Sequence, residues 1–167
     1  MRKGFSFIEL IIVVVIIAIL AVVAIPRILD IGDMRLSVAL GKVAGDIKFA
    51  REFAMNYNRR TRITFLSAQN RYIVEALNSF TSAWEVLEDP ATRDDFDIIL
   101  NTGHYKKVEI SSASFDGQNR VEFDSVGAPS TTSGPLAATG AVNMKYTGST
   151  STSTINVEPV TGRVDIP

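Results

Sequence analysis

Residues 3–26 read KGFSFIELIIVVVIIAILAVVAIP, and this stretch decides the fold of the first part of the chain. Sixteen uninterrupted apolar residues run from Leu10 to Ile25, and a basic pair, Arg2-Lys3, stands ahead of them. A helix over residues 5–25 would be about 31 Å long, close to the hydrocarbon thickness of a bilayer. The sequence therefore predicts a single membrane-length helix, with its basic head on the cytoplasmic side and the rest of the chain outside.

Glu9 is the charged residue that distinguishes between interpretations of this helix. A carboxylate in a membrane helix costs about 2.5–3.5 kcal/mol on insertion scales, and such residues usually have a partner. A cut between Gly4 and Phe5 would create an amine one helical turn before Glu9, on the same helix face. We therefore predict that Glu9 pairs with this amine, in its own chain or in a neighbouring copy. The alternatives are a cleaved secretory signal, a plain signal anchor, and a harmless Glu9 at headgroup level.

The residues KGFSFIEL, followed by the aliphatic run and Pro26, resemble the class III signal of type IV pilins and type II secretion pseudopilins. The resemblance implies that residues 1–4 are a leader peptide, removed after Gly4 by a prepilin peptidase on the cytoplasmic side. It implies N-methylation of Phe5 by the same enzyme. It also implies that Glu9 aids the docking of each new subunit into a helical filament.

The helix is expected to resume after Pro26, which should kink or loosen it because proline removes one helical hydrogen bond. Apolar residues continue at alternating steps of three and four, which indicates one buried stripe. This pattern predicts an amphipathic second half over residues 26–58. The stripe consists of Leu36, Leu40, Val43, Ile47, Ala50, Ala54 and Tyr57.

Small residues occupy the opposite face of this second half, because Ser37, Gly41 and Gly45 follow one another at steps of four. Each glycine costs about 1 kcal/mol relative to alanine in a helix interior, and small residues let another backbone approach closely. We predict that this face packs against adjacent subunits. The alternative is that it is solvated or covered by a loop of the same chain.

From Thr61 the apolar period changes to two, which is typical of strands. A helix followed by consecutive strands predicts an α+β fold, in which an antiparallel sheet in residues 59–167 packs on the apolar stripe. Turn signals such as Asp116-Gly117 separate the later strands. The expected strands are residues 61–65, 71–77, 107–110, 120–123, 141–147, 154–157 and 163–166.

This layout resembles the GspH/FimT group of minor pseudopilins and minor pilins. The resemblance is carried by Arg35-Leu36 and by the segments AREFA (50–54), FDSVG (123–127) and TGRV (161–164). It implies the type IV pilin-like fold, a long bent N-terminal helix packed on a C-terminal antiparallel β-sheet. It also implies incorporation at the start or tip of a type II secretion pseudopilus or a type IV pilus.

Composition restricts the chemistry that this chain offers. The 167 residues carry a net charge of −1, no cysteine and one histidine, His104, and the pI is near 5.8. Disulfide and thiolate chemistry are excluded, and a Ser-His triad or a histidine-based metal site is a poor assignment. No nucleophile–base pair or phosphate loop is found. We therefore predict a structural subunit that is itself an enzyme's substrate, with no cofactor and no metal.

Two further interpretations stay open. The arginines Arg59, Arg60 and Arg62 suggest a DNA-binding minor pilin, with Arg163 as a fourth contact. The resemblance to DNA-uptake minor pilins of the FimT type implies a C-terminal motif like Gly-Arg-x-Arg. However, the tail here reads Gly162-Arg163-Val164-Asp165, where an acid replaces the second arginine, and the charge balance does not favour a nucleic-acid partner. The alternative is that these arginines lie at the C-terminal end of the helix because the helix dipole favours positive charge there. The third interpretation is a plain membrane-anchored binding domain.

The segment from residue 78 to 104 is expected to be an irregular, variable loop. It contains six acidic residues between positions 85 and 97, without the spacing of an EF-hand, so we predict a solvated segment and not a calcium site. Trp84 is predicted to be a partly buried packing residue, and His104 a surface residue.

Overall fold

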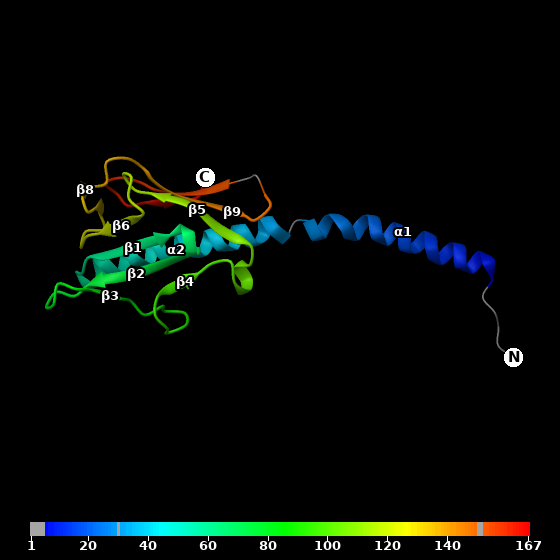
Figure 1. Ribbon diagram of the computed structural model, residues 1–167, viewed down its shortest axis with the longest axis horizontal. Helices are drawn as coiled ribbons and strands as arrows, with labels where there is room; N and C mark the ends of the chain where they lie inside the picture. Colours follow the sequence, from blue (N-terminus) through cyan, green and yellow to red (C-terminus); the bar gives the residue numbers. More distant parts are fainter. Residues whose placement is uncertain (1–5, 30, 150–151) are drawn as a thin grey trace. The chain divides into compact units, whose positions relative to one another are not determined.

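The computed structural model describes residues 6–29, 31–149 and 152–167. The chain divides into two compact units, with the boundary between Met34 and Arg35, and each unit is considered by itself. Helix α1 (Phe7–Leu29) belongs to the first unit. Helix α2 (Ile31–Tyr57) begins in the first unit and continues into the second, which also contains the strands (Figure 1).

Helix α2 confirms that the chain is helical again after Pro26. It ends at Tyr57, one residue before the predicted boundary at position 58, and Asn58 follows it with a left-handed φ of 50°. Residues of the predicted stripe from Leu36 to Ala54 are buried. Tyr57 was placed in the stripe wrongly, because its side chain is 65% exposed. As the last residue of the helix, it stacks on Phe53 with ring centroids 4.3 Å apart instead of entering the core.

The strands pair antiparallel throughout and form two sheets in the described part of the chain, where we expected one. The order is β3-β2-β1-β6-β7-β8 in the first sheet, with β4 also on β2, and β11-β10-β9-β5 in the second. The bounds are β1 (Thr61–Leu66), β2 (Arg71–Leu77), β3 (Trp84–Val86), β4 (Asp97–Ile99), β5 (Val108–Ser114), β6 (Arg120–Phe123), β7 (Pro129–Thr131), β8 (Gly134–Pro135), β9 (Gly140–Tyr146), β10 (Thr152–Val157) and β11 (Val164–Asp165).

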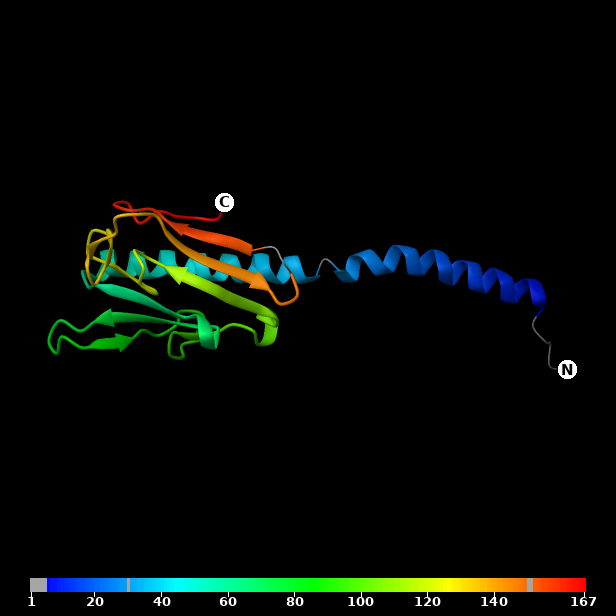
Figure 2. The ribbon, with the colours of Figure 1, turned by 45° about the horizontal axis from the view of Figure 1, so that its top comes forward.

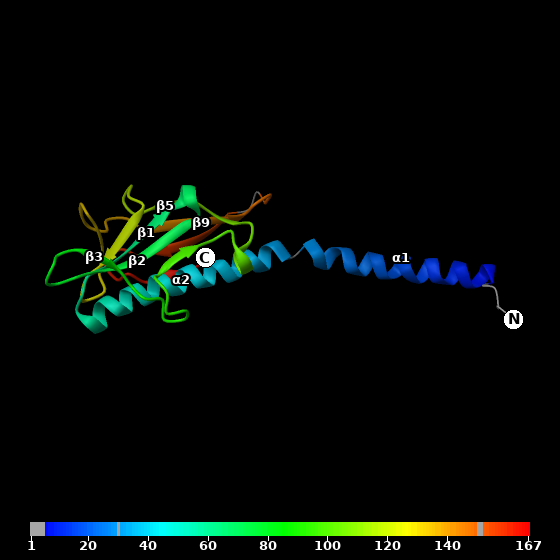
Figure 3. The same cartoon turned by 60° about the horizontal axis from the view of Figure 1, so that its bottom comes forward.

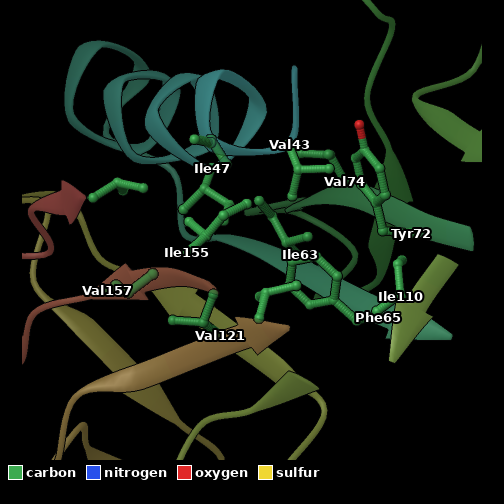
Figure 4. Packing of buried hydrophobic residues seen from close by; sticks show 14 of the residues in the cluster. Val43, Ile47, Ile63, Phe65, Tyr72, Val74, Ile110, Val121, Ile155 and Val157 are labelled. Carbon is green, nitrogen blue, oxygen red and sulfur yellow. The ribbon is translucent and has the colours of Figure 1, made fainter. Parts of the chain in front are cut away.

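The core lies between α2 and the inner faces of both sheets. Figures 2 and 3, two views of the same ribbon, show that α2 runs along the strands. Val43 and Ile47 of α2 point toward Ile63 of β1 and Ile155 of β10 (Figure 4), and all four side chains are fully buried. Buried and partly buried residues alternate along β1 and β2, as expected of strands with one face on a core. The predicted α+β class, a helix packed on antiparallel strands, is confirmed.

Candidate functional site

Helix α1 presents apolar side chains that no core of this chain covers. Its large hydrophobic residues from Phe7 to Leu20 are between 45% and 78% exposed. An apolar surface of this extent marks an interaction with lipid or with another protein. The described residues contain no helix that combines the length and the hydropathy needed to cross a membrane.

Glu9 lies in the first turn of α1 and is exposed. The carbonyl of Ser6 begins the helix by accepting hydrogen bonds from the backbone N–H groups of Glu9 (3.0 Å) and Leu10 (3.2 Å). An acid in the first turn is favoured by the helix dipole. Gly4 and Phe5, the predicted cleavage and methylation residues, lie outside the described residues. The pairing of Glu9 with the Phe5 amine therefore stays a prediction.

Pro26 lies within α1, which continues to Leu29, and α2 begins at Ile31. The helix is thus not ended by the proline. The kink predicted at Pro26 concerns the direction of the segments on its two sides and stays a prediction.

Ser37, Gly41 and Gly45 all lie on the exposed side of α2. A Cβ atom added to Gly41 or Gly45 would meet nothing within 4 Å, so a loop of the globular unit does not cover these two positions. Val38, Lys48, Glu52 and Met55 are exposed as well and, at helical spacing, share this side. We call this surface, from Ser37 to Met55, the exposed α2 face. It is open for a neighbour at the positions that the sequence indicated.

A buried charge cluster supports α2 from its other side. The Nζ of Lys42 lies 2.9 Å from Asp46 Oδ1 and 3.3 Å from Asp89 Oδ2. The hydroxyl of the fully buried Tyr72 donates to Asp46 Oδ2, and the Lys42 ammonium lies 5.1 Å from the centre of the Phe96 ring. The cluster joins α2 to β2 and to the segment around Asp89.

Burial and the neighbouring charges together set the pKa values of this cluster. Burial raises the pKa of Asp46 above its ordinary 3.8, against hydrogen bonds from Tyr72 and Lys42 that lower it. Because the folded state binds this proton more tightly than the unfolded state, the Asp46 contribution to stability is full below pH 3.8 and is lost as the pH rises through the folded pKa. Burial lowers the pKa of Lys42, but hydrogen bonds and charges from Asp46 and Asp89 outweigh it, so that this pKa lies above 10.5.

Sequence reasoning did not find this cluster. The available signal was the pair Lys42 and Asp46, which are four residues apart beside the apolar stripe. Asp46 directly precedes Ile47, a residue of that stripe. Burial raises the pKa of Tyr72 well above 10.0, and the charge of Asp46 acts in the same direction. The tyrosine therefore serves as a permanent hydrogen-bond donor to Asp46.

The segments that carried the family resemblance meet around Arg51. The Nε of Arg51 donates to the carbonyl of Gly127, at 3.0 Å. A Cβ on Gly162 would lie 2.7 Å from that carbonyl oxygen and 3.1 Å from Arg51 Cδ. The AREFA segment of α2 thus holds the turns of the FDSVG and TGRV segments together. Close packing and positive φ angles explain a glycine at both turns.

The arginines proposed for DNA contact are each paired with acids. Arg62 makes a two-pronged contact with Glu75 at 2.6 and 2.9 Å, and Arg60 pairs with Glu122. Arg59 lies 3.6 Å from Glu85 and donates to the carbonyl of Leu77. The tail arginine, Arg163, lies 2.8 Å from Asp165. Their charges are compensated within the chain, so the structure adds no support for a phosphate-binding surface.

The segment from residue 78 to 104 is more ordered than predicted, because it contributes β3 and β4 to the first sheet. Its acids are dispersed: Asp89 joins the buried cluster, and Asp97 pairs with Arg71. Among the described residues, no group of three or more histidine, aspartate or glutamate residues could hold a metal ion. Trp84 is half-buried with Arg62 over its ring at 4.4 Å, and His104 is exposed, both as predicted.

A helix packed on antiparallel strands, preceded by an exposed apolar helix with an acid in its first turn, defines a pilin-like subunit. Two family models match the chain: the prokaryotic N-terminal methylation motif over residues 1–25 and the type II transport protein GspH over residues 39–161. The chain belongs to the GspH family. It is a minor pseudopilin or minor pilin, a subunit that assembles into a pseudopilus or pilus.

Solved structures show the same fold. Two structures of the minor pseudopilin EpsH from the type II secretion system of Vibrio cholerae have TM-scores of 0.58 and 0.57 at 7% and 8% identity; the matches cover 80% and 79% of this chain and 96% and 92% of EpsH. The type IV minor pilin FimU of Pseudomonas aeruginosa has a TM-score of 0.51 at 13% identity, over 79% of this chain and 87% of FimU. No curated protein matches the chain in sequence. At these identities the likeness is one of fold.

Proposed function

We propose that the chain is made as a precursor, that a prepilin peptidase cuts it between Gly4 and Phe5, and that the new amine of Phe5 is methylated. The mature subunit then enters a type II secretion pseudopilus or type IV pilus near its start or tip. Its role is structural and not catalytic. The observation that carries this proposal is the match of the N-terminal methylation motif to residues 1–25, with Glu9 in the first turn of α1.

The exposed apolar surface of α1 supports a membrane anchor as the state before assembly. In this proposal Arg2 and Lys3 stay on the cytoplasmic side of the inner membrane, and the globular domain lies in the periplasm or outside the cell. In the filament, the apolar helices of neighbouring subunits replace the lipid around α1. Glu9 then fixes the register through an amine, its own or a neighbour's.

Processing tests the proposal directly. Intact mass spectrometry of the chain, made in a host with its prepilin peptidase, should find residues 5–167 with one methyl group. Gly4→Val, which puts a branched side chain at the cut, should leave the full precursor, whereas Ser6→Ala should be processed normally. Retention of Met1 in the unaltered chain, or a start far downstream of Phe5, would overturn the proposal.

The exposed α2 face gives a second test, in which stability and assembly move in opposite directions. Gly45→Ala has room for its Cβ in the free subunit, so it should raise the unfolding free energy by about 0.5–1 kcal/mol through helix propensity. If a neighbour packs closely on this face, the same methyl group should lower incorporation into filaments. The two readouts are thermal unfolding and the amount of subunit in sheared filaments.

Glu52→Ala is the matched control, because it removes bulk from the same face and adds none. It should assemble like the unaltered chain. Normal incorporation of Gly45→Ala would contradict close packing at Gly45.

A further inference from the structure

The globular unit carries unpaired positive charge at the end where α2 enters it. The arginines near the other end of α2 are paired with acids, as described above. In contrast, Arg35, Lys106 and Lys107 make no ion pair with any residue in the described part of the chain. Both lysines are exposed, and Arg35 is partly so. We call these three residues the basic patch.

The basic patch comes from two segments that lie together. Arg35 is the first residue of the globular unit, and its Nη1 lies 3.5 Å from the carbonyl oxygen of Lys106. Lys106 and Lys107 follow the short helix η2 (Gly103–Tyr105) and precede β5. Figures 1 and 3 show this turn beside the N-terminal half of α2.

The acids at this end do not neutralise the basic patch. Glu109 is engaged elsewhere, because it lies 3.8 Å from Lys145 Nζ and accepts a 2.7 Å hydrogen bond from the Thr147 hydroxyl. Asp33, two positions before Arg35, is an exposed acid in the first turn of α2, where the helix dipole favours it. Three unpaired cations against this acid leave the surface net positive.

Lys107 is presented by an ordered backbone. Its φ of +69° lies in the left-handed region, which asparagine and glycine adopt more readily than lysine. The N–H of Lys107 donates to Asn101 Oδ1 at 2.8 Å, and its carbonyl accepts a hydrogen bond from the N–H of Thr147 at 2.7 Å. Since the side chain is exposed, a lysine contributes positive charge here and no packing. An ordered backbone reduces the entropy cost of binding.

The chain length keeps the basic patch close to the apolar run of α1. Arg35 follows Ile25, the last residue of that run, by ten positions, and residues 26–29 and 31–35 are helical. Nine helical steps and one extended step measure at most about 17 Å along the chain, whatever the angle between the two units. The headgroup layer reaches about 5–8 Å beyond the hydrocarbon. Long lysine and arginine side chains can therefore reach the headgroups of a membrane that contains this run.

We infer that the basic patch docks the globular unit on the anionic phosphate headgroups of the membrane before assembly. The inference rests on the proposed function, which places α1 in that membrane. Charge selects this partner, because unpaired ammonium and guanidinium groups are attracted to an anionic lipid surface and much less to a neutral one. Each such cation near the surface should shift the ratio of docked to undocked subunit about fivefold. Entry into a filament then requires release of this contact.

A single fluorescent label measures the docking, since the chain has no cysteine of its own. His104→Cys, at an exposed position of η2, carries the label in the processed chain, reconstituted into vesicles. A lipid with a spin label on its headgroup should quench it strongly in equal mixtures of phosphatidylcholine and phosphatidylglycerol. Quenching should be weak in phosphatidylcholine alone and at high salt. Ser79→Cys, exposed in the turn between β2 and β3, is the control position and should not be quenched.

Lys107→Asn separates lipid binding from folding. Asparagine tolerates the left-handed conformation, so the full-length variant should unfold at a temperature no lower than that of the unaltered chain. Combined with Lys106→Gln, it should lower the docked-to-undocked ratio about 25-fold, fivefold for each charge. Arg93→Asn is the matched control, an exposed cation with a φ of +65° and no ion pair among the described residues, and it should dock normally.

The outcomes distinguish this inference from the proposed function. Equal quenching in both kinds of vesicle, or quenching that survives the loss of both lysines, overturns the inference. Absence of quenching in vesicles that hold the chain also overturns it and leaves the proposed function intact. If the chain does not float with the vesicles at all, the membrane anchor and the inference both fail. If Lys107→Asn lowers the unfolding temperature, the fivefold loss expected of Lys106→Gln alone decides.

Discussion

Glu9→Ala is expected to reduce incorporation of the subunit into filaments by at least about tenfold, while cleavage after Gly4 continues. The acid lies in the first turn of α1, in a helix whose apolar side chains are exposed in the free subunit. When neighbouring helices cover that surface, the amine of Phe5 needs a counter-charge, and an unpaired charge there costs several kcal/mol. The measurement compares the processed subunit in the membrane with that in sheared filaments.

Glu9→Gln keeps the shape of the side chain and removes its charge, so it should fail in the same way. Leu10→Ala shortens the next side chain without changing the charge and should assemble far better than either. Filaments that contain Glu9→Ala at the normal level would show that the acid does not set the register.

The helical part of the fold could be predicted because one periodic signal governs it. The steps of three and four from Leu36 to Ala54 correspond to side chains that are buried in the structure. The same reasoning located β2 and β6 at their observed bounds, since both alternate clearly and are flanked by turn residues. Local pattern and tertiary environment agree in α2 and β2, whereas in β6 the polar Glu122 is buried together with its apolar neighbours.

Four strands escaped prediction because their pairing is not encoded locally. β7 and β8 contain Pro129 and the pair Gly134-Pro135, which read as turn signals. β3 and β4 are three residues each, lie among acids, and exist because both pair with β2. Short strands of this kind depend on a neighbour that is already in place.

The candidate site likewise contains features that the sequence could predict and features that it could not. The exposure of Gly41 and Gly45 follows from their position opposite the apolar stripe, and it was predictable. The ion pairs of Arg60 and Arg62 with strand residues were not predictable. Glu122 lies 62 positions from Arg60 in the sequence, and the register between strands decides both contacts. The cluster of arginines in the sequence therefore suggested a positively charged surface, but acidic residues that the fold brings close largely compensate these charges.

The buried cluster yields the largest expected change in stability. Asp89→Ala should lower the unfolding free energy by about 2–3 kcal/mol, since it removes one partner of a buried charge pair. The carboxylate is 2% exposed, lies 3.3 Å from Lys42 Nζ, and accepts a 2.8 Å hydrogen bond from the N–H of Ala91. Asp46 remains beside Lys42 and keeps the loss at the lower end of the range for broken buried pairs. Urea unfolding followed by the fluorescence of Trp84, the single tryptophan, measures the change.

Asp94→Ala is the matched control, an exposed acid of the same segment whose side chain should contribute less than about 0.5 kcal/mol. Equal effects of Asp89→Ala and Asp94→Ala would contradict the role of the cluster. The result also bears on assembly, because Asp89 fastens its segment to Lys42 of α2, and the opposite side of α2 is the exposed face. Loosening this support should therefore reduce filament incorporation as well, in proportion to the unfolded fraction and without changing the interface itself.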